Sequence, residues 1–264
     1  MSWEEREILL IIKTYPIRSD KYVNTVCAAG ILEDTNEWVR IYPISWLTFK
    51  NKNLKKFIRF KAEIMKNRSD KRKESYKIRE NTIQIIDESL TNTKKKDVWL
   101  KRKQILNNYI TDSLETLKES YKDDRTSLGM IKPNPETTEF IITKKVDEID
   151  IDIDSSTQYT LTGQKLRKVD EIENVFKYKF KCNIPECSGH RIICEDWELY
   201  QAFRSWRQKY GTEQLEKNLK NKFIFKKNEL YFMLGTHFRW STWLIIGLFY
   251  PPKIREENAI LKFI

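Results

Sequence analysis

The chain has 264 residues, 33% of them charged and 40% hydrophobic, and its formal net charge is +11. This length supplies either one large domain or two modest domains with full hydrophobic cores. No apolar stretch is long enough for a signal peptide or a membrane span, so the sequence predicts a cytoplasmic protein with reduced cysteines and no membrane partner. The excess of 49 lysines and arginines over 38 acidic residues favours a polyanionic partner, nucleic acid first.

Residues 1–92 are rich in short β-like runs. Apolar or alternating runs over 7–13, 23–32, 37–44, 57–65 and 76–86 predict strands, and residues 33–36 (EDTN) predict a hairpin turn. Strands of this length with few helical stretches between them are typical of a small barrel. We therefore expect an N-terminal β-rich, barrel-like domain over residues 1–92.

The rest of the chain predicts helices as well as strands, so the fold class is α+β. Residues 93–156 are expected to form a helical connector with helical periodicity over 94–121, followed by a strand over 140–146. Residues 157–264 are expected to form a Cys/His-containing α+β domain. Its predicted elements are strands over 176–181, 230–234 and 243–250, a helix over 195–210 and a basic linker after that helix.

Three of the four cysteines and one of the two histidines fall close together. Cys182, Cys187, His190 and Cys194 have the spacing C-x4-C-x2-H-x3-C. Thiolates and imidazole together favour a tetrahedral zinc ion, and clustered cysteines in a reducing compartment bind metals more often than they form disulfides. The alternative is a loop with two surface thiols, in which Cys194 is an ordinary core residue.

Basic residues with aromatic neighbours occur in three places, which is the composition of a surface for single-stranded nucleic acid. The alternative is a set of solvated loops and helix faces. The candidate contacts are Lys66, Arg68, Lys71, Arg72, Lys73, Tyr76, Lys77 and Arg79, then Lys101, Arg102 and Lys103 in the expected connector, and Arg204 and Arg207 in the C-terminal helix.

Two groups of residues would suit an enzyme instead. The alternating acids Asp150, Asp152 and Asp154 could hold magnesium for nuclease chemistry, although an acidic linker has the same pattern. His237 could act as a general base with Asp196 if the fold joins them, although a turn histidine is the simpler interpretation. The chain has only seven glycines and no phosphate-binding loop, which argues against a nucleotide-cradling enzyme.

Several motifs together resemble a family of uncharacterised prokaryotic proteins. They are residues 13–16 (KTYP), 38–43 (WVRIYP), 69–76 (SDKRKESY), 187–190 (CSGH), 196–198 (DWE) and 246–252 (IGLFYPP). The chain also resembles, in composition, the accessory proteins that accompany prokaryotic Argonautes.

These resemblances imply a basic accessory subunit of a prokaryotic antiviral defence complex. It would bind single-stranded nucleic acid or a guide–target duplex, DNA or RNA, beside a larger effector protein such as an Argonaute. The alternatives are a metal-dependent nuclease or nucleic-acid-modifying enzyme, and a scaffold whose lysine content reflects codon bias.

Overall fold

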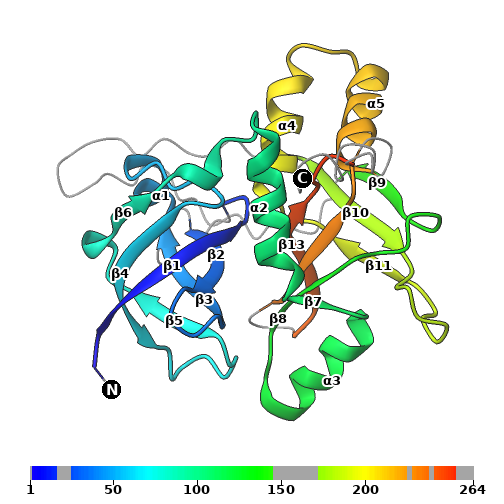
Figure 1. The fold of residues 1–264 in the computed structure, drawn as a ribbon. Helices are drawn as coiled ribbons and strands as arrows, with labels where there is room; N and C mark the ends of the chain where they lie inside the picture. Colours follow the sequence, from blue (N-terminus) through cyan, green and yellow to red (C-terminus); the bar gives the residue numbers. More distant parts are fainter. Residues whose placement is uncertain (1, 17–24, 145–171, 225–227, 238–240, 254–264) are drawn as a thin grey trace, which may run out of the picture.

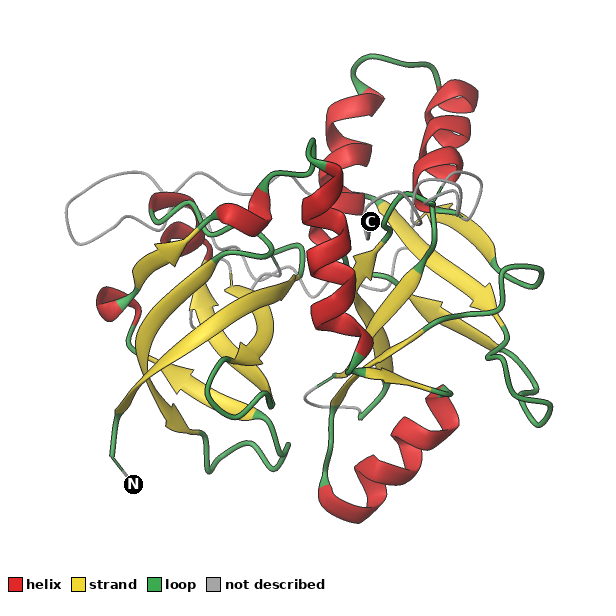
Figure 2. Cartoon of the chain, viewed as in Figure 1, coloured by secondary structure: helices red, strands yellow, loops and turns green. Residues whose placement is uncertain are grey.

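The computed structural model describes residues 2–16, 25–144, 172–224, 228–237 and 241–253. It is an α+β fold in which two β-barrels lie side by side and helix α2 (Lys96–Asn107) runs between them (Figures 1 and 2). The N-terminal barrel, the helices in the middle of the chain and the C-terminal mixed region with the Cys/His loop are as the sequence predicts. The strands at 128–131 and 139–144, within the expected connector, pair with strands of the second barrel. The acidic segment with Asp150, Asp152 and Asp154, and the expected boundary at residue 156, lie outside the described residues.

The first barrel closes with the strand order β1-β2-β3-β5-β4 and back to β1. Only β3 and β5 pair in parallel, with Arg40 opposite Ser75. The short helix α1 (Trp46–Asn51) lies between β3 and β4, and a sixth strand, β6 (Gln84–Asp87), adds to β4. The five barrel strands are β1 (Glu4–Lys13), β2 (Thr25–Leu32), β3 (Trp38–Ser45), β4 (Arg59–Lys66) and β5 (Ser75–Ile78).

The second barrel repeats this order with a divided first strand. β8 pairs with β12 and β9 pairs with β10, so the consecutive strands β8 and β9 together occupy the first position. Beyond β11, Cys194 forms a parallel bridge to Ile245 of β13, which supplies the parallel contact between third and fifth strands. The strands are β8 (Leu128–Ile131), β9 (Glu139–Lys144), β10 (Asn174–Phe180), β11 (His190–Ile193), β12 (Tyr231–Thr236) and β13 (Trp243–Phe249), with β7 (Ile110–Thr111) paired to β8.

A five-stranded Greek-key barrel with this order, a parallel pairing of strands three and five and a helical insertion after strand three is the OB-fold. The chain is therefore a tandem of two OB-folds. In the first barrel the insertion is the one-and-a-half-turn α1. In the second barrel it is the hairpin of α4 (Trp197–Arg207) and α5 (Thr212–Phe223).

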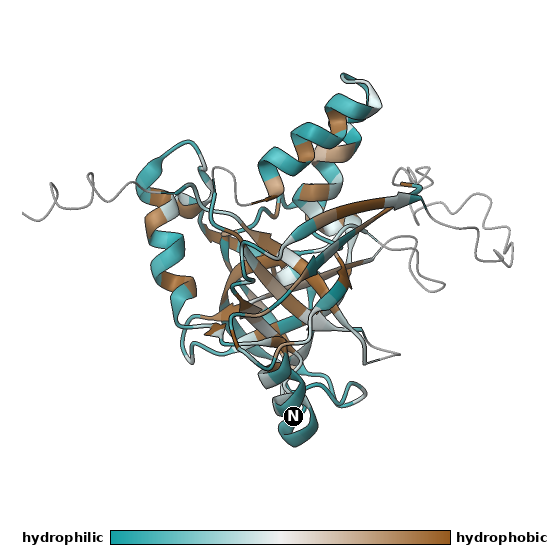
Figure 3. Ribbon diagram, turned by 90° about the vertical axis from the view of Figure 1, so that its right-hand side faces the viewer, coloured by the Kyte–Doolittle hydropathy of each residue, from teal (hydrophilic) through white to brown (hydrophobic). Residues whose placement is uncertain are grey.

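Strand β1 is buried on both faces, which explains its unbroken apolar run. Ile8 and Leu10 point into the first barrel, whereas Leu9, Ile11 and Ile12 pack against Met130, Met233 and Ile246 of the second. The register shifts between Leu10 and Ile12, so a bulge places both Ile11 and Ile12 on the outer face. In Figure 3 the most hydrophobic residues concentrate on the central strands, while the helices carry polar outer faces.

The helices differ from the sequence expectation at two places. The predicted helix over 94–121 is two helices, α2 and α3 (Leu114–Asp124), because β7 intervenes and Ser113 caps α3 by accepting a hydrogen bond from Thr116 N. The predicted basic linker after residue 210 instead contains α5. Its residues Leu215, Leu219 and Phe223 recur every four positions and are buried, so each contributes about 2 kcal/mol to stability.

Most predicted strands are confirmed within two or three residues of their ends. The hairpin turn at 33–36 is confirmed as well, with Asn36 in the left-handed region and its N–H donating to Leu32 O over 2.8 Å. No helix in the described ranges has the length and apolar character needed to cross a bilayer.

Candidate metal centre and nucleic-acid interface

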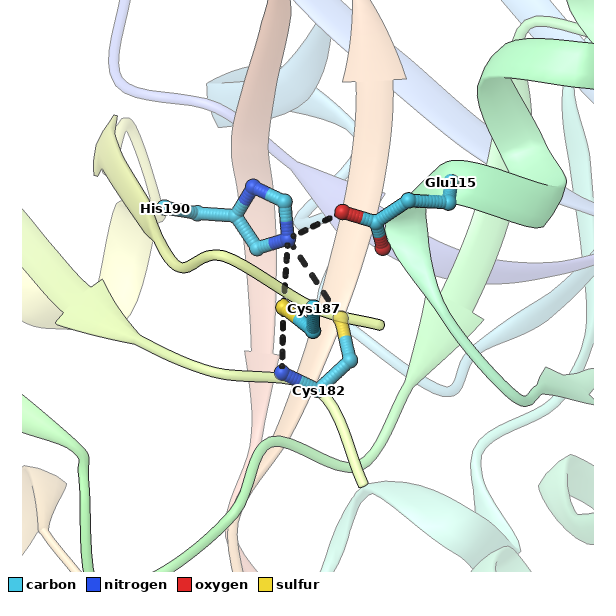
Figure 4. Close-up of side chains that lie close together, drawn as sticks. All are labelled: Glu115, Cys182, Cys187 and His190. Atoms are coloured by element: carbon cyan, nitrogen blue, oxygen red, sulfur yellow. Dashed lines mark hydrogen bonds and ion pairs between the residues drawn. The ribbon is translucent and has the colours of Figure 1, made fainter. Parts of the chain in front are cut away.

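Four potential metal ligands come from three segments of the second barrel. Cys182 directly follows β10, Cys187 lies in the turn after it, and His190 begins β11. Gly189 has a φ of +107°, a conformation that glycine adopts without strain, and it returns the chain from the turn into β11. The fourth ligand is Glu115, in the first turn of α3 (Figure 4).

The ligand atoms have the spacing of a single metal site. His190 Nε2 lies 3.6 Å from Cys182 Sγ, 3.2 Å from Cys187 Sγ and 3.0 Å from Glu115 Oε1. All four ligand atoms lie within 4.8 Å of one another. Ligands bound roughly 2.0–2.3 Å from a tetrahedral ion are separated by about 3.3–3.8 Å, so the cluster can hold one metal ion.

Glu115 is placed as a ligand rather than as an orienting partner of the histidine. It contacts the same ring nitrogen, Nε2, that faces both sulfur atoms, and that nitrogen cannot both bind a metal and donate to a carboxylate. The second carboxylate oxygen, Oε2, is buried and has no hydrogen-bond partner among the described residues. A cation between the four groups would satisfy it.

The electrostatics of the cluster also call for a cation. Burial raises the pKa of the Cys182 thiol to about 12 and lowers the pKa of His190. At neutral pH the protein alone therefore holds a protonated thiol and a neutral imidazole beside a carboxylate. A divalent ion would favour the deprotonated thiols and match the donor set of two sulfur atoms, one nitrogen and one oxygen.

Cys194, the fourth ligand expected from the spacing, is not brought to this cluster. It is fully buried in the core of the second barrel, and its backbone pairs with Ile245 and Phe176. Ile192 and Cys194 both face the core. Cys194 lies four residues beyond His190 in extended chain, a separation of about 13 Å, which is too far for both side chains to bind one ion. Glu115 takes the fourth position, and nothing in the local spacing of residues 182–194 could have identified it.

The predicted basic segment 66–79 alternates between exposed and buried residues. Arg68, Lys71 and Lys73 are exposed in the loop between β4 and β5. Arg72 is buried and pairs with Asp70, its Nη2 lying 2.6 Å from Oδ2. Burial opposes ionisation of Asp70, but the hydrogen bonds from Arg72 and Ser75 outweigh it and hold the pKa of this carboxyl below its usual value. Arg72 is therefore a structural residue and not an available nucleic-acid contact.

The β4–β5 loop of the first barrel contacts the second barrel at the end of β12 and at the C-terminal end of α3. Arg72 Nη1 donates to Thr236 O, at the end of β12, over 2.8 Å. Lys73 N donates to Arg125 O at the end of α3, and Lys73 Nζ lies 2.5 Å from Asp124 Oδ2. Tyr121 of α3 shares a hydrogen bond of 2.9 Å with Ser241, in the loop between β12 and β13. The β4–β5 loop thus meets the end of β12 beside α3, and Ser241, just before β13, contacts the same helix; we call this surface the loop junction.

The other predicted nucleic-acid contacts have varied surroundings. Lys66 Nζ lies 4.7 Å from the ring centre of half-buried Tyr76, Lys77 is exposed, and Arg79 pairs with Glu63. On α2, Lys101 is exposed and Lys103 pairs with Glu229, but Arg102 is buried and donates to Leu90 O, so it stabilises the fold.

Arg204 and Arg207 lie in the last turn of α4. Figure 1 places this helix at the opposite end of the molecule from β5. The structure therefore does not join the three basic clusters into one surface.

Two acidic residues of the 196–198 motif pair with a lysine of the first barrel. Lys56 Nζ is buried and lies 3.1 Å from Asp196 Oδ2 and 3.4 Å from Glu198 Oε2. Burial opposes its charge, but both carboxylates raise the pKa of Lys56 above its ordinary value. Asp196 also caps α4 by accepting a hydrogen bond from Leu199 N, so it is committed to structure and not free to act as a general base with His237.

Within the described ranges, the Glu/Cys/Cys/His cluster is the one group of three or more potential metal ligands.

Two family models match the sequence. Residues 4–108 match a domain of unknown function, DUF8758, and residues 110–263 match a second, DUF8757. The division falls between α2 and β7, which is also where the second barrel begins. No curated protein sequence matches the chain.

Three solved structures share limited similarity with the chain. One, described as the molecular basis for abrogation of activation of pro-inflammatory cytokines, has 13% identity and a TM-score of 0.33, covering 73% of this chain and 77% of its own. The p204 HINb domain has 10% identity and a TM-score of 0.33. A murine DNA-binding protein bound with double-stranded DNA has 8% identity and a TM-score of 0.32. Both alignments cover 95% of this chain and 97% of the other. The fold assignment rests on the strand order described above.

Proposed function

The chain belongs to the family described as a domain of unknown function, DUF8757, and we propose that it binds single-stranded nucleic acid across the loop junction, with a structural zinc ion in the Glu/Cys/Cys/His cluster. The observation that carries this proposal is the contact between the β4–β5 loop and the end of β12. OB-folds bind oligonucleotides through the loop between strands four and five together with the face of strands two and three. Here the β4–β5 loop of the first barrel is fixed beside Thr236 and Ser241, the described residues that flank the corresponding loop of the second.

Charge supports the same surface. Arg68, Lys71 and Lys73 project from a loop whose own acids, Asp70 and Glu74, are buried and hydrogen-bonded. Asp70 neutralises Arg72, and Glu74 accepts from Ser127 N over 2.8 Å, so neither acid faces the solvent as a free charge. The exposed cations are thereby presented on a hydrogen-bonded loop, and of the three Lys73 is also paired with Asp124 of the neighbouring barrel, a pair that a phosphate would have to displace. Such a loop loses little entropy on binding a phosphate backbone.

The zinc ion would hold the second barrel's architecture rather than react. Four protein ligands leave no open coordination position for water or substrate, which is the arrangement of structural zinc sites. The ion would tie the turn between β10 and β11 to α3, and α3 borders the loop junction through Tyr121 and Arg125. Metal binding would therefore support the nucleic-acid surface indirectly.

The accessory role in a defence complex beside an Argonaute or another effector stays a prediction, since it concerns a partner chain. Co-purification of the effector with tagged protein, before and after nuclease treatment, tests it. Association that survives nuclease treatment would support a direct protein contact.

Strand binding is tested by fluorescence anisotropy with labelled DNA and RNA of about 20 nucleotides, single-stranded and duplex. We expect the variant Arg68→Ala/Lys71→Ala/Lys73→Ala to bind single strands more weakly whatever their sequence. Its plot of log Kd against log salt concentration should be shallower by about 2, because each phosphate contact to a single strand contributes roughly 0.7 to this slope.

A matched control removes three exposed lysines elsewhere. Lys95→Ala/Lys209→Ala/Lys217→Ala makes the same change in net charge away from the loop junction. We expect its affinity to fall only slightly. Equal losses in the two triple variants would mean that net charge alone attracts nucleic acid, and no loss in either would reject the loop junction as the binding surface.

A further inference from the structure

The junction between the barrels contains a cleft that strand binding at the loop junction does not use. It has a volume of about 470 Å³, within the range of small-molecule sites. The end of β1, helix α1, helix α2 and the first turn of α4 contribute its walls, and these elements meet in the upper centre of Figure 1. Its lining combines five cations, one carboxylate (Glu198), two tryptophans and a few amide and hydroxyl groups.

The aromatic wall comes from both barrels. The rings of Trp46 and Trp197 lie against each other, inclined by 37° with their centres 4.7 Å apart, and Tyr15 stacks on Trp197. Both tryptophans are only half-buried, so part of the stack faces the cleft. A partly exposed, rigid tryptophan stack offers a planar platform for another aromatic ring.

A buried ammonium group lies behind this platform. Lys13 is 7% exposed, and its Nζ lies 4.1 Å from the ring centre of Trp197, 4.8 Å from Phe49 and 5.2 Å from Trp46. Lys13 Nζ donates a hydrogen bond to Leu54 O over 3.3 Å. Burial lowers the pKa of Lys13 to about 8, so the ammonium form is costly where it stands.

A second buried cation contributes to the same cleft. Arg102 of α2 is 3% exposed, donates to Leu90 O and stacks over Phe57 and Trp99. Within the described residues, neither Arg102 nor Lys13 has a carboxylate within ion-pair distance, in contrast with Lys56 beside them. Glu198, which also lines the cleft, acts on both cations from beyond ion-pair distance and is itself paired with Lys56. Two desolvated cations with no carboxylate in direct contact favour a bound anion. Lys50 and Lys55 add positive charge at the rim.

We propose that this cleft binds a nucleotide, with the base stacked on the Trp46–Trp197 pair and the phosphate beside Lys13 and Arg102. A nucleotide joins an aromatic ring to an anion, and the cleft offers groups for both. Asn53, Thr91 and Thr93 supply polar contacts for the base edge or the ribose. The nucleotide is either free or the terminal unit of a strand.

Isothermal titration calorimetry with AMP, adenosine and inorganic phosphate tests this site. We expect AMP to bind, and adenosine and phosphate each to bind at least about tenfold more weakly, because each lacks one half of the recognition. Lys13→Gln and Trp46→Leu should each raise the Kd for AMP about tenfold, and AMP should quench tryptophan fluorescence less in Trp46→Leu.

The control is Lys52→Gln, an exposed lysine of the loop after α1 that does not line the cleft. It should bind AMP as the unchanged protein does. Because Trp46 is half-buried, Trp46→Leu remains a valid test if Lys13→Gln fails to fold. An absence of AMP binding at millimolar concentration, or full affinity in both folded cleft variants, would overturn the proposal.

Two short oligonucleotides that differ only in a 5′-phosphate separate the two sources of the ligand. A preference for the phosphorylated strand that Lys13→Gln abolishes assigns the cleft to strand ends, whereas AMP binding without that preference assigns it to free nucleotides. The variant Arg68→Ala/Lys71→Ala/Lys73→Ala should keep its AMP affinity. Failure of the loop junction and failure of this cleft are thus measured independently.

Discussion

The two barrels share one strand order but hold their loops in different ways. In the first barrel, the β4–β5 loop is fixed by charged side chains that bond to the second barrel, namely Arg72 to Thr236 and Glu74 to Ser127. In the second barrel, the turn between β10 and β11 is fixed to α3 by the Glu/Cys/Cys/His cluster. The loop of the first barrel is therefore fixed by its neighbour, whereas the second barrel has a cluster of potential metal ligands of its own.

Their cores differ as well. The first barrel is filled almost wholly by aliphatic side chains such as Ile8, Val26 and Ile64. The second is built around stacked aromatic rings, with Phe176 in contact with Phe140, Tyr200 and Phe203. Larger rings require more covering surface, and the α4–α5 hairpin supplies it. The same topology is thus compatible with a small closed core and with a larger one that helices extend.

The largest predicted effect concerns the metal cluster. Cys187→Ser should release the metal and lower the free energy of unfolding by roughly 5 kcal/mol or more. The reason is that the free energy of binding a structural ion contributes directly to the stability of the folded state. Elemental analysis and thermal unfolding measure the two effects together. We expect about one zinc ion per chain before the change.

Cys194→Ser is the matched control for that experiment. It should lower stability by burying a hydroxyl group in the core while leaving the metal content unchanged. Loss of zinc in Cys194→Ser, with zinc retained in Cys187→Ser, would return Cys194 to the ligand set and remove Cys187.

The next largest effect concerns the buried ion pair that joins the barrels. Lys56→Met leaves Asp196 buried without its counter-ion and should lower the free energy of unfolding by about 3–5 kcal/mol. Urea unfolding measures the loss. Lys55→Met, next to it and exposed, should cost less than about 0.5 kcal/mol. Identical midpoints for the two variants would show that the first barrel does not depend on this contact.

Two glycines allow a smaller effect to be compared between barrels. A Cβ on Gly30 would lie 2.3 Å from Leu9 O, so the backbone of β1 must move. A Cβ on Gly129 would meet the side chain of Leu117 at the same distance, and a side chain can change rotamer more easily than a strand can shift. Gly30→Ala should therefore lower the free energy of unfolding by about 2–3 kcal/mol, and Gly129→Ala should lower it less. Thermal unfolding of the two variants measures both losses. The opposite order would show that the second barrel is the more tightly packed.

The smallest effect depends on pH. Burial disfavours the charge of Glu229, but hydrogen bonds from Lys103, Tyr231 and Lys132 lower its pKa to about 2. A carboxyl with a lowered pKa in the folded state stabilises the fold above its ordinary pKa of 4.5, and this contribution is lost as pH falls from about 4.5 to 2. Because the lysines are partly exposed, the contribution is roughly 1–2 kcal/mol.

Glu229→Gln should therefore unfold more easily than the unchanged protein at pH 7, and the difference should vanish near pH 2. Thermal unfolding over this pH range measures it. A difference between the two proteins that is the same at pH 7 and pH 2 would show that the carboxylate's charge contributes nothing.

The sequence alone determined the local elements. Alternating and apolar runs identified β1 to β4, β9, β10, β12 and β13, and apolar spacing identified α2 and α4, because these patterns reflect which face of each element is buried. The missed elements are short or ambiguous: β8 and β11 have only four residues each, and the charged surface of α5 hid its apolar stripe. The clustering of Cys182, Cys187 and His190 was also visible, since the three residues lie in one turn.

Tertiary structure decided which of these residues meet. Glu115 joins the cluster only because α3 packs against the end of β10, and Cys194 leaves it because its side chain turns into the barrel core. Arg72 and Arg102 have the same charge as their exposed neighbours, yet the interface between the barrels buries both. The pairing of β8 with β12 and of β9 with β10 closes the second OB-fold through contacts between distant segments, and no local pattern in the sequence encodes such contacts.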